Sequence, residues 1–331
     1  MAKTSEHHVA VVGGDTLLAR EVREVLTSSE PAPRIHLLSA STDASPVLTA
    51  DEEEAVVMTP LTAKTLEGKA VAFLAGSPGA ARRAFKLAPK AALIDLTGAL
   101  DEQPEARLRA PSAEPANTKR GSATLQVIAH PAAIALTTLL ARLSVLGKLR
   151  ASVAHVFEPA SERGQKGIEE LRKQTVGVLS FQKLDTTVFD TQLAFNMLAR
   201  YGEEAMEPLE GVEQRVERHA ASLLSAWPGL PMPSIRLIQA PVFHGHSLSV
   251  WVEFETEADA TQVEKTLAEF GVDVRPDEPP SNAHIAGQSG LSVGAINVDR
   301  NNPRACWIWV VTDNLRLAAD NAVAVAKELL G

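Results

Sequence analysis

The stretch that orders the chain is IAHPAAIAL, residues 128–136. An apolar segment at 124–129 predicts a buried strand, and the apolar spacing after the stretch is typical of a helix packed on that strand. His130-Pro131 marks the corner between them, because the residue before a proline avoids helical dihedrals. Catalytic groups gather at such strand ends in open α/β sheets. The residues that stand at this corner are Ala132 and Ala133, and neither can act as a nucleophile.

The totals narrow the class of protein. A chain of 331 residues exceeds one ordinary core, so two domains are expected. The formal net charge of −9 argues against a nucleic-acid or anionic-membrane partner. The N-terminal stretch lacks the apolar core of a secretion signal, and no apolar run approaches the roughly 18 residues of a membrane span. We therefore expect a cytoplasmic protein. The single cysteine, Cys306, lies in an apolar run and is expected to be small, buried and unreactive.

Strands alternate with helices in the first part of the chain, which predicts βαβ units and a parallel sheet. Strands are expected at 8–13, 35–38, 70–75 and 92–96, and helices at 17–26 and 80–87. The acidic run at 51–54 is interpreted as a solvated edge or loop. The segment 101–122, rich in proline, alanine and charge, predicts a long irregular connection.

The second half has longer helices and alternating strands. Helices are expected at 164–173, 192–198, 212–226, 257–270 and 313–330. Strands are expected at 152–157, 247–255, 292–298 and 307–311. The run SLSVWVEFE at 247–255 alternates with period two, which predicts one buried face and one polar or paired face.

The first strand-to-helix turn, Gly13-Gly14-Asp15-Thr16, is a candidate phosphate-binding turn. Glycine occurs only at its start, and the Asp15 carboxylate would repel a pyrophosphate. A plain structural turn is therefore an equal alternative.

Several motifs together carry a family resemblance. They are QLAFNMLARYG from Gln192, QAPVFHGHSLSVWVE from Gln239, LSVGAIN, WIWVVTDNLRLAADNAVAVA, and FLAGS with IDLTGAL. In the order in which they occur along the chain, beginning with FLAGS and IDLTGAL, these motifs resemble the aspartate-semialdehyde dehydrogenase family over nearly the whole chain. The glutamine of QAPVFHGH resembles the family's Usg-type branch, whose members lack the catalytic cysteine.

The resemblance implies an α/β fold with a Rossmann-like NAD(P)-binding domain and an α+β dimerisation or catalytic-type domain. The first would span 1–131 and be completed by the closing helix at 313–331, and the second would span 132–312. It also implies NADP as cofactor, a homodimer, and reductive dephosphorylation of aspartyl phosphate through a cysteine thioester.

Carried over position by position, the family's catalytic parts are mostly replaced. Ala133 stands at the nucleophile position, Gln239 at the substrate-carboxylate arginine, and Asp101 at the phosphate arginine. Glu158 stands where the family has a glutamine beside the nucleophile. His246 aligns with the catalytic base, and Glu217 with the carboxylate that binds the substrate amine.

The cofactor positions have also changed. The family's three turn glycines are Gly13, Thr16 and Ala19 here, and the arginine for the 2′-phosphate of NADP is Thr42. The positions that keep the family residue are Gly76, Ser77, Ser161, Gly164 and Asn314. We expect NADPH to bind weakly or not at all.

Two classes of function follow. The first is a homodimeric interaction or ligand-sensing protein that keeps the fold without the chemistry, with another protein as a further open partner. The alternative is an active NAD(P)-dependent oxidoreductase that uses His246 and Glu158 as an acid/base pair. His244 and His246 alternate and could both face a metal, but no third ligand is evident. We therefore expect no metal and interpret His246 as a retained structural histidine.

Overall fold

A computed structural model of the protein describes residues 4–40, 47–51, 54–87, 90–118 and 123–331. The chain divides into two compact units. The first comprises Met1–Ala129 and Ala318–Gly331, and the second comprises His130–Leu317. The domain limits expected at 131/132 and 312/313 stay a prediction, because a compact unit defined by contacts is not the same as a folding domain.

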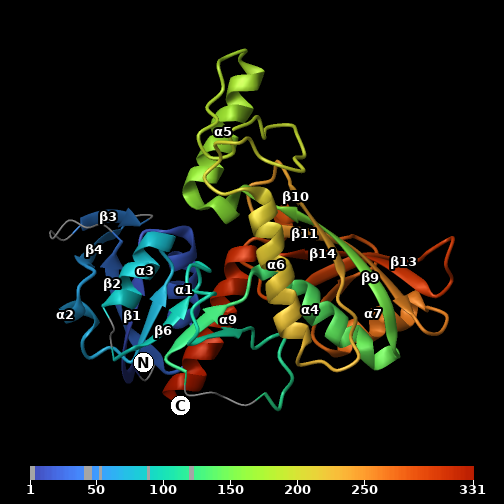
Figure 1. Cartoon of the computed structure of the whole chain (residues 1–331), viewed down its shortest axis with the longest axis horizontal. Helices are drawn as coiled ribbons and strands as arrows, with labels where there is room; N and C mark the ends of the chain where they lie inside the picture. Colours follow the sequence, from blue (N-terminus) through green and yellow to red (C-terminus); the bar gives the residue numbers. More distant parts are fainter. Residues whose placement is uncertain (1–3, 41–46, 52–53, 88–89, 119–122) are drawn as a thin grey trace. The chain divides into compact units, whose positions relative to one another are not determined.

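An eight-stranded sheet forms the first unit, with the strand order β3-β4-β2-β1-β5-β6-β8-β7. Neighbouring strands are parallel except β3 and β4, which are antiparallel. The strands are β1 (Thr4–Val12), β2 (Ala32–Ser39), β3 (Val47–Asp51), β4 (Glu54–Pro60), β5 (Val71–Leu74), β6 (Ala92–Asp95), β7 (Ala106–Arg109) and β8 (Leu125–Ile128). The connecting helices are α1 (Leu17–Thr27), α2 (Ala63–Leu66) and α3 (Pro78–Lys86) (Figure 1). This is the Rossmann-like architecture that the sequence predicts.

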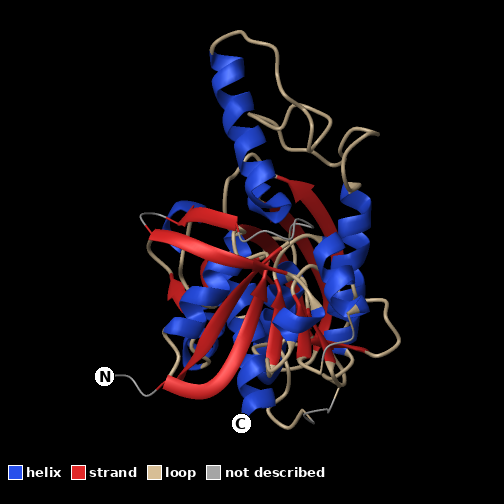
Figure 2. Cartoon of the chain, turned by 90° about the vertical axis from the view of Figure 1, so that its left-hand side faces the viewer, coloured by secondary structure: helices blue, strands red, loops and turns tan. Residues whose placement is uncertain are grey.

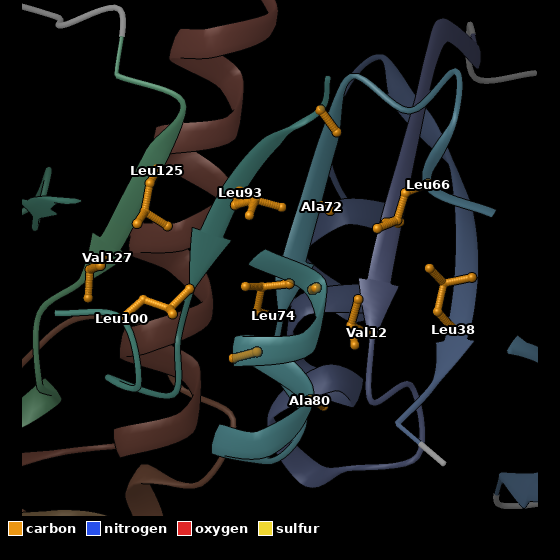
Figure 3. Close-up of a cluster of buried hydrophobic side chains, with 14 residues drawn as sticks. Val12, Leu38, Leu66, Ala72, Leu74, Ala80, Leu93, Leu100, Leu125 and Val127 are labelled. Carbon is orange, nitrogen blue, oxygen red and sulfur yellow. The ribbon is translucent and has the colours of Figure 1, made fainter. Parts of the chain in front are cut away.

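The core of the first unit lies on its central strands. Val12, Leu74 and Leu93 come from three neighbouring strands and pack beside one another, and α3 adds Ala80 (Figure 3). Every residue of β5 and of β8 is buried, so these strands are covered on both faces. Continuous apolar runs of this kind are typical of parallel sheets, which explains why the sequence located these strands correctly.

The prediction of an irregular connection at 101–122 is wrong for its middle part, because β7 pairs with β8 at the edge of the sheet. The strand reads ARLR, and its two arginines conceal any apolar pattern. Arg109 is nevertheless buried, with its Nε 2.8 Å from Glu114 and its Nη2 2.8 Å from Glu328. Glu114 follows five positions later, but Glu328 lies 219 positions away, so no local pattern reveals the full compensation of the buried charge.

A six-stranded mixed sheet forms the second unit, with the order β10-β9-β11-β14-β13-β12. Its strands are β9 (Leu149–Glu158), β10 (Ser234–Gln239), β11 (His246–Phe254), β12 (Asp273–Arg275), β13 (Ser292–Val298) and β14 (Ala305–Thr312). Its helical elements are α4 (Pro131–Leu143), η1 (Ser144–Leu146), η2 (Ala160–Arg163), α5 (Gly164–Leu179), α6 (Leu209–Leu224), α7 (Ala260–Glu269), α8 (Asn282–Ile285) and the start of α9 (Asn314–Leu330). α4 and α6 lie side by side on one face of the sheet, and α7 packs against α4 (Figure 1).

The corner predicted at His130-Pro131 is confirmed. α4 begins at Pro131, and the His130 side chain caps it by accepting the N–H of Ala132 at 3.3 Å. Proline suits the first helical position, because its missing N–H would have no partner there.

The helix predicted at 192–198 is wrong. The segment is an irregular loop held by Gln174 of α5, whose Oε1 accepts the N–H groups of Leu193 and Ala194 at 2.7 and 3.1 Å. A buried carboxamide thus takes the backbone donors that a helix would use, and Phe195 has a positive φ of 66°. α5 and the loop after it extend beyond the end of the six-stranded sheet in both views (Figures 1 and 2). Among the described helices, none is long and apolar enough to cross a membrane.

Candidate functional site

Four polar residues line up across one end of the six-stranded sheet. Gln239 of β10 is the register partner of Glu158 of β9, and His246 of β11 is the partner of Thr312 of β14. The β9–β11 register continues to place His246 beside Glu158, because Ser247 pairs with Phe157. All four side chains are fully buried on the same face as α4 and α6. The sheet therefore brings together three of the catalytic positions predicted from the sequence.

Glu158 forms a buried ion pair with Arg163 of η2. The Oε1 of Glu158 lies 3.1 Å from Nη2 of Arg163, and the guanidinium also lies 3.4 Å from Glu207. Neither Glu158 oxygen has a hydrogen-bond partner among the described residues. Burial raises the pKa of Glu158 to about 8, although the positive charge of Arg163 acts in the opposite direction. The carboxyl is thus committed to an arginine and not to His246.

Gln239 has its polar atoms bonded inside the protein. Its Nε2 donates to the carbonyl oxygens of Glu158 and Ala240 at 2.8 and 3.0 Å. Its Oε1 accepts the hydroxyl of Tyr201 in a very short contact. Tyr201 also lies against Arg163, with 5.5 Å from the guanidinium carbon to the ring centre. Gln239 is therefore a neutral side chain whose amide atoms are bonded to Tyr201, Glu158 and Ala240.

The imidazole of His246 is fully buried, and neither of its ring nitrogens has a hydrogen-bond partner among the described residues. Its Nε2 lies 3.8 Å from Oε1 of Glu162. Burial lowers the pKa of His246, although the carboxylates of Glu162 and Asp313 oppose the shift. The ring is therefore neutral at pH 7.

His130 brings a second imidazole to the same place. Its ring centre lies 5.6 Å from that of His246, and its Nε2 lies 3.6 Å from Oε2 of Glu162. Burial lowers the pKa of His130 well below its usual value, and the neighbouring His246 acts in the same direction. The backbone N–H of His130 donates to Nδ1 of His219 on α6 at 2.9 Å. Ala133 lies fully buried in the first turn of α4, three residues beyond His130.

The cofactor positions in the second unit are bonded to one another. Asn314 accepts the Ser161 hydroxyl and the Gly245 N–H, both at 3.1 Å. Its Nδ2 donates to Oε1 of Glu162 at 2.9 Å. Gly164 begins α5 with a positive φ of 62°, a conformation that favours glycine. These residues have structural roles that are sufficient to account for them.

Glu217 lies apart from this cluster. It is half-buried on α6, two positions from both Arg215 and His219, and residues two apart on a helix do not share a face. Arg215 pairs with Glu207, and His219 bonds to His130, so these two define the side of α6 that meets the site. Asp101 belongs to the first unit, where its charge raises the pKa of the buried Asp95 in addition to the larger effect of burial.

The two glycine turns of the first unit pack directly against each other. A side chain at Gly13 would bring its Cβ to 2.3 Å from the Cα of Gly76, and Gly13 has a positive φ of 82°. Thr16 accepts the N–H of Ala19 at 3.1 Å and donates to the carbonyl of Ala75 at 2.7 Å. Ser77 caps α3 in the same way, through the N–H of Ala80 at 3.2 Å. Both glycines and both caps are thus used by the fold itself.

This turn does not fit a pyrophosphate well. Such a ligand needs backbone N–H groups at the helix start and no competing anion. Here the Thr16 hydroxyl already takes one of those donors, and Asp15 is exposed at the turn. Thr42, which the sequence predicts at the position of the 2′-phosphate arginine, lies outside the described residues.

Sequence reasoning missed Glu162 and Arg163 as site residues. They follow Ser161 where the family's Y-Q-A-x-S-G-A-G motif has glycine and alanine. Two charged residues in place of two small ones could have indicated, from the sequence alone, that this part of the site differs from the family pattern. It also missed Tyr201, Arg215 and His219, which reach the site only through the fold.

Comparisons with known proteins agree with this architecture. A family described as "Semialdehyde dehydrogenase, dimerisation domain" matches residues 140–317. A USG-1 protein homologue of Azotobacter vinelandii is 30% identical over 97% of both chains. An aspartate-semialdehyde dehydrogenase of Rickettsia bellii is 24% identical over 99% of this chain and 98% of its own. The structure of a probable aspartate-semialdehyde dehydrogenase from Pseudomonas aeruginosa is 27% identical, with a TM-score of 0.84 over 98% of this chain and 99% of its own.

The chain therefore belongs to the semialdehyde dehydrogenase family, with USG-1 homologues and aspartate-semialdehyde dehydrogenases among its relatives. This confirms the resemblance and the fold class inferred from the sequence. A more distant structure, the aspartate-semialdehyde dehydrogenase of Candida albicans, contains NADP; it is 16% identical, with a TM-score of 0.69 over 98% of both chains.

Proposed function

We propose that this protein is a homodimeric member of the semialdehyde dehydrogenase family that does not catalyse NADP-dependent reductive dephosphorylation of aspartyl phosphate. The observation that carries the proposal is that the polar groups of the site are already bonded to other protein groups. Gln239 is saturated by Tyr201 and two carbonyl groups, and Glu158 is paired with Arg163.

The family reaction needs a thiolate that attacks the acyl group. Ala133 at the nucleophile position cannot supply one, and Cys306 is buried on β14 with its pKa raised by burial to about 11. A thiol with a raised pKa is mostly protonated at pH 7 and is a poor nucleophile. Loss of a covalent nucleophile typically removes several orders of magnitude of rate.

The two anionic groups of the substrate, its carboxylate and its phosphate, would find no arginine at the positions where the family binds them. Gln239 is neutral where an arginine would bind the carboxylate, and Asp101 is anionic where an arginine would bind phosphate. Arg163 is nearby, but it is paired with both Glu158 and Glu207. A substrate carboxylate would have to displace these partners, and the free energy needed for this would weaken substrate binding.

A weak or absent affinity for NADP is part of the proposal. It is supported by the capped start of α1 and by the exposed Asp15 in the first glycine turn. The alternative of an active oxidoreductase requires Glu158 and His246 to act as a pair. That alternative is less well supported, because the ion partner of Glu158 is Arg163, whereas the carboxylate that pairs with His246 belongs to Glu162.

The dimer is supported by the apolar surface of the second unit. The sheet face opposite α4 and α6 has a hollow of about 430 Å³ lined by Trp307, Trp309 and neighbouring residues. The segment after β9 exposes large apolar side chains, namely Val176, Leu179, Phe181, Phe195 and Met197. Exposed apolar surface of this extent is typical of a protein interface. A second copy of the chain fits best, since residues 140–317 match a dimerisation domain.

The test is an activity assay with a cysteine-containing family enzyme as positive control. Purified protein is mixed with aspartate semialdehyde, phosphate and NADP, and NADPH formation is followed by absorbance. We expect none above background, and calorimetric titration with NADPH and with NADH should show weak binding or none. Turnover well above background that His246→Ala abolishes would overturn the proposal. A cytoplasmic location and a further protein partner stay predictions.

A further inference from the structure

Three metal-ligating side chains converge at the site from three separate elements. His130 caps α4, Glu162 lies in η2 after β9, and His246 begins β11. One potential ligand atom from each lies within 4.8 Å of the other two. The Nε2 atoms of His130 and His246 lie 3.6 and 3.8 Å from the two different oxygens of Glu162.

These distances are too long for hydrogen bonds, which rarely exceed about 3.2 Å between nitrogen and oxygen. They are close to the spacing of two ligands that share an ion. Two atoms that each lie about 2.0–2.2 Å from a tetrahedral Zn²⁺ are separated by about 3.3–3.6 Å. The two imidazoles face different oxygens of Glu162, and the three ligand atoms lie within 4.8 Å of one another, so the side chains must move closer together before one oxygen and both nitrogens can share an ion.

His246 supplies an independent observation. Its imidazole is fully buried, yet neither ring nitrogen has a partner among the described residues. Buried polar atoms in native proteins are nearly always satisfied, so these two nitrogens indicate a bound water or ion as their partner. The Nε2 atom faces the carboxylate of Glu162, which places the unmet bonding capacity between the two residues.

We propose that His130, Glu162 and His246 form a binding site for one divalent transition-metal ion of the Zn²⁺ class. Two imidazole nitrogens and one carboxylate oxygen suit Zn²⁺, Co²⁺ or Fe²⁺, whereas Mg²⁺ and Ca²⁺ prefer oxygen ligands. Three protein ligands leave a coordination position open for water or a small anion. The sequence expectation of no metal weighed only His244 with His246, whereas the fold pairs His246 with residues 116 and 84 positions earlier in the chain.

The surroundings orient these ligands. Asn314 donates to Oε1 of Glu162 at 2.9 Å and is itself held by Ser161 and Gly245. Hydrogen bonds of this kind around the ligands fix their orientation in metal sites. The capping bond from Ala132 N–H to Nδ1 places the His130 proton on Nε2. Metal binding by the neutral imidazole at Nε2 therefore places that proton on Nδ1, and the 3.3 Å cap is given up.

The experiment measures metal binding by the full chain, independently of any enzymatic activity. His8 and His36 lie 2.9 Å apart in the first unit and could hold a second ion, so all variants carry His8→Gln as background. Each protein is stripped with a chelator, then titrated by calorimetry with ZnCl₂, CoCl₂ and MgCl₂. Bound metal is counted after dialysis, and the visible spectrum of the Co²⁺ form reports its coordination.

We expect one Zn²⁺ or Co²⁺ per chain and no competition by Mg²⁺. Loss of residues that only orient ligands typically weakens metal binding 10–100-fold, so Glu162→Gln and His246→Gln, which remove ligands, should weaken it at least about 100-fold. His130→Asn should do the same while keeping a good helix cap, because asparagine is favoured at that position. His244→Gln is the matched control and should bind like the background protein.

Three results would overturn the site. They are no Zn²⁺ or Co²⁺ binding by the folded background protein, equal binding in the three ligand variants, or loss of binding in His244→Gln. Circular dichroism and gel filtration establish whether each variant is folded. If Glu162→Gln or His246→Gln does not fold, the result for His130→Asn decides the test. Because no step involves NADP or aspartate semialdehyde, failure here leaves the proposed loss of catalysis untouched.

Discussion

Glu158 and Arg163 face each other at the buried end of β9, with 3.1 Å between Oε1 and Nη2 and no exposure of the carboxylate. They are five positions apart in sequence, and the short helix η2 turns the arginine back toward the strand end. When both groups of such a buried pair are charged, removal of one partner destabilises the fold, because the other charge stays buried without compensation.

Above pH 8, where Glu158 is ionised despite its raised pKa, Arg163→Ala should destabilise the protein by about 3–5 kcal/mol, because it leaves a buried carboxylate without its partner. Urea denaturation followed by circular dichroism measures the loss. In the double variant Glu158→Gln with Arg163→Met the buried pair is gone, and most of that stability should return. Equal midpoints for Arg163→Ala and wild type would contradict the importance of the pair.

Asp95 predicts a pH dependence in the first unit. Its buried carboxylate accepts hydrogen bonds from the N–H groups of Thr97 and Leu100, yet burial raises its pKa. The folded state then holds a proton that the unfolded state has already released, so stability falls as the pH rises through this window. Asp95 contributes its full stabilisation below the unfolded-state pKa of about 3.9 and none above the folded-state pKa. Between the two, the free energy of unfolding falls by up to about 1.4 kcal/mol per pH unit.

The comparison that isolates this effect is Asp95→Asn. The variant should be less stable overall by about 1–2 kcal/mol, because one amide oxygen cannot replace both carboxylate oxygens. As the pH rises above about 4, its stability should decline less steeply than that of wild type, measured by urea midpoints. Parallel curves for the two proteins would rule out a raised pKa at Asp95.

Ala133→Cys should not restore the family reaction. A cysteine there would lie at the start of α4, where a helix N-terminus favours the thiolate, but Gln239 and Asp101 would still oppose substrate binding. NADPH formation should stay at least about 1,000-fold below that of a cysteine-containing family enzyme. Iodoacetamide labelling, compared with wild type that has only Cys306, tells whether the new thiol is reactive. Recovery of turnover would mean that the clamp positions matter less than proposed.

Trp307→Glu should weaken the dimer. Trp307 is 38% exposed on the open sheet face and lies across from Trp251 in the register with β11. Truncating an aromatic anchor at an interface typically costs about 2–4 kcal/mol, which is roughly 30- to 1,000-fold in the dimer dissociation constant. Sedimentation velocity over a dilution series measures it. Val57→Glu, at an exposed position of the first unit, is the control that should leave the dimer intact.

The sequence by itself determined the family, the two-part α/β fold and the corner at His130-Pro131. These rest on local signals, namely continuous apolar runs for buried strands, a proline at a helix start and several motifs in order. Most strands and helices were located within a few residues for the same reason. Local signals failed where distant groups supply the bonding, as at β7 with its buried Arg109 and in the loop 192–198 held by Gln174.

Only the tertiary structure decided which side chains meet at the end of the six-stranded sheet. His130, Glu162 and His246 are separated by 32 and 84 positions, and no spacing rule connects a helix cap, a turn and a strand start. Likewise, the sequence predicts Gln239 at a substrate-binding position, but its hydrogen bond to Tyr201 depends on a loop that folds back onto β10. The physical reason is the same in both cases. Side chains act through distance and burial, and these are properties of the packed sheet rather than of the order of residues.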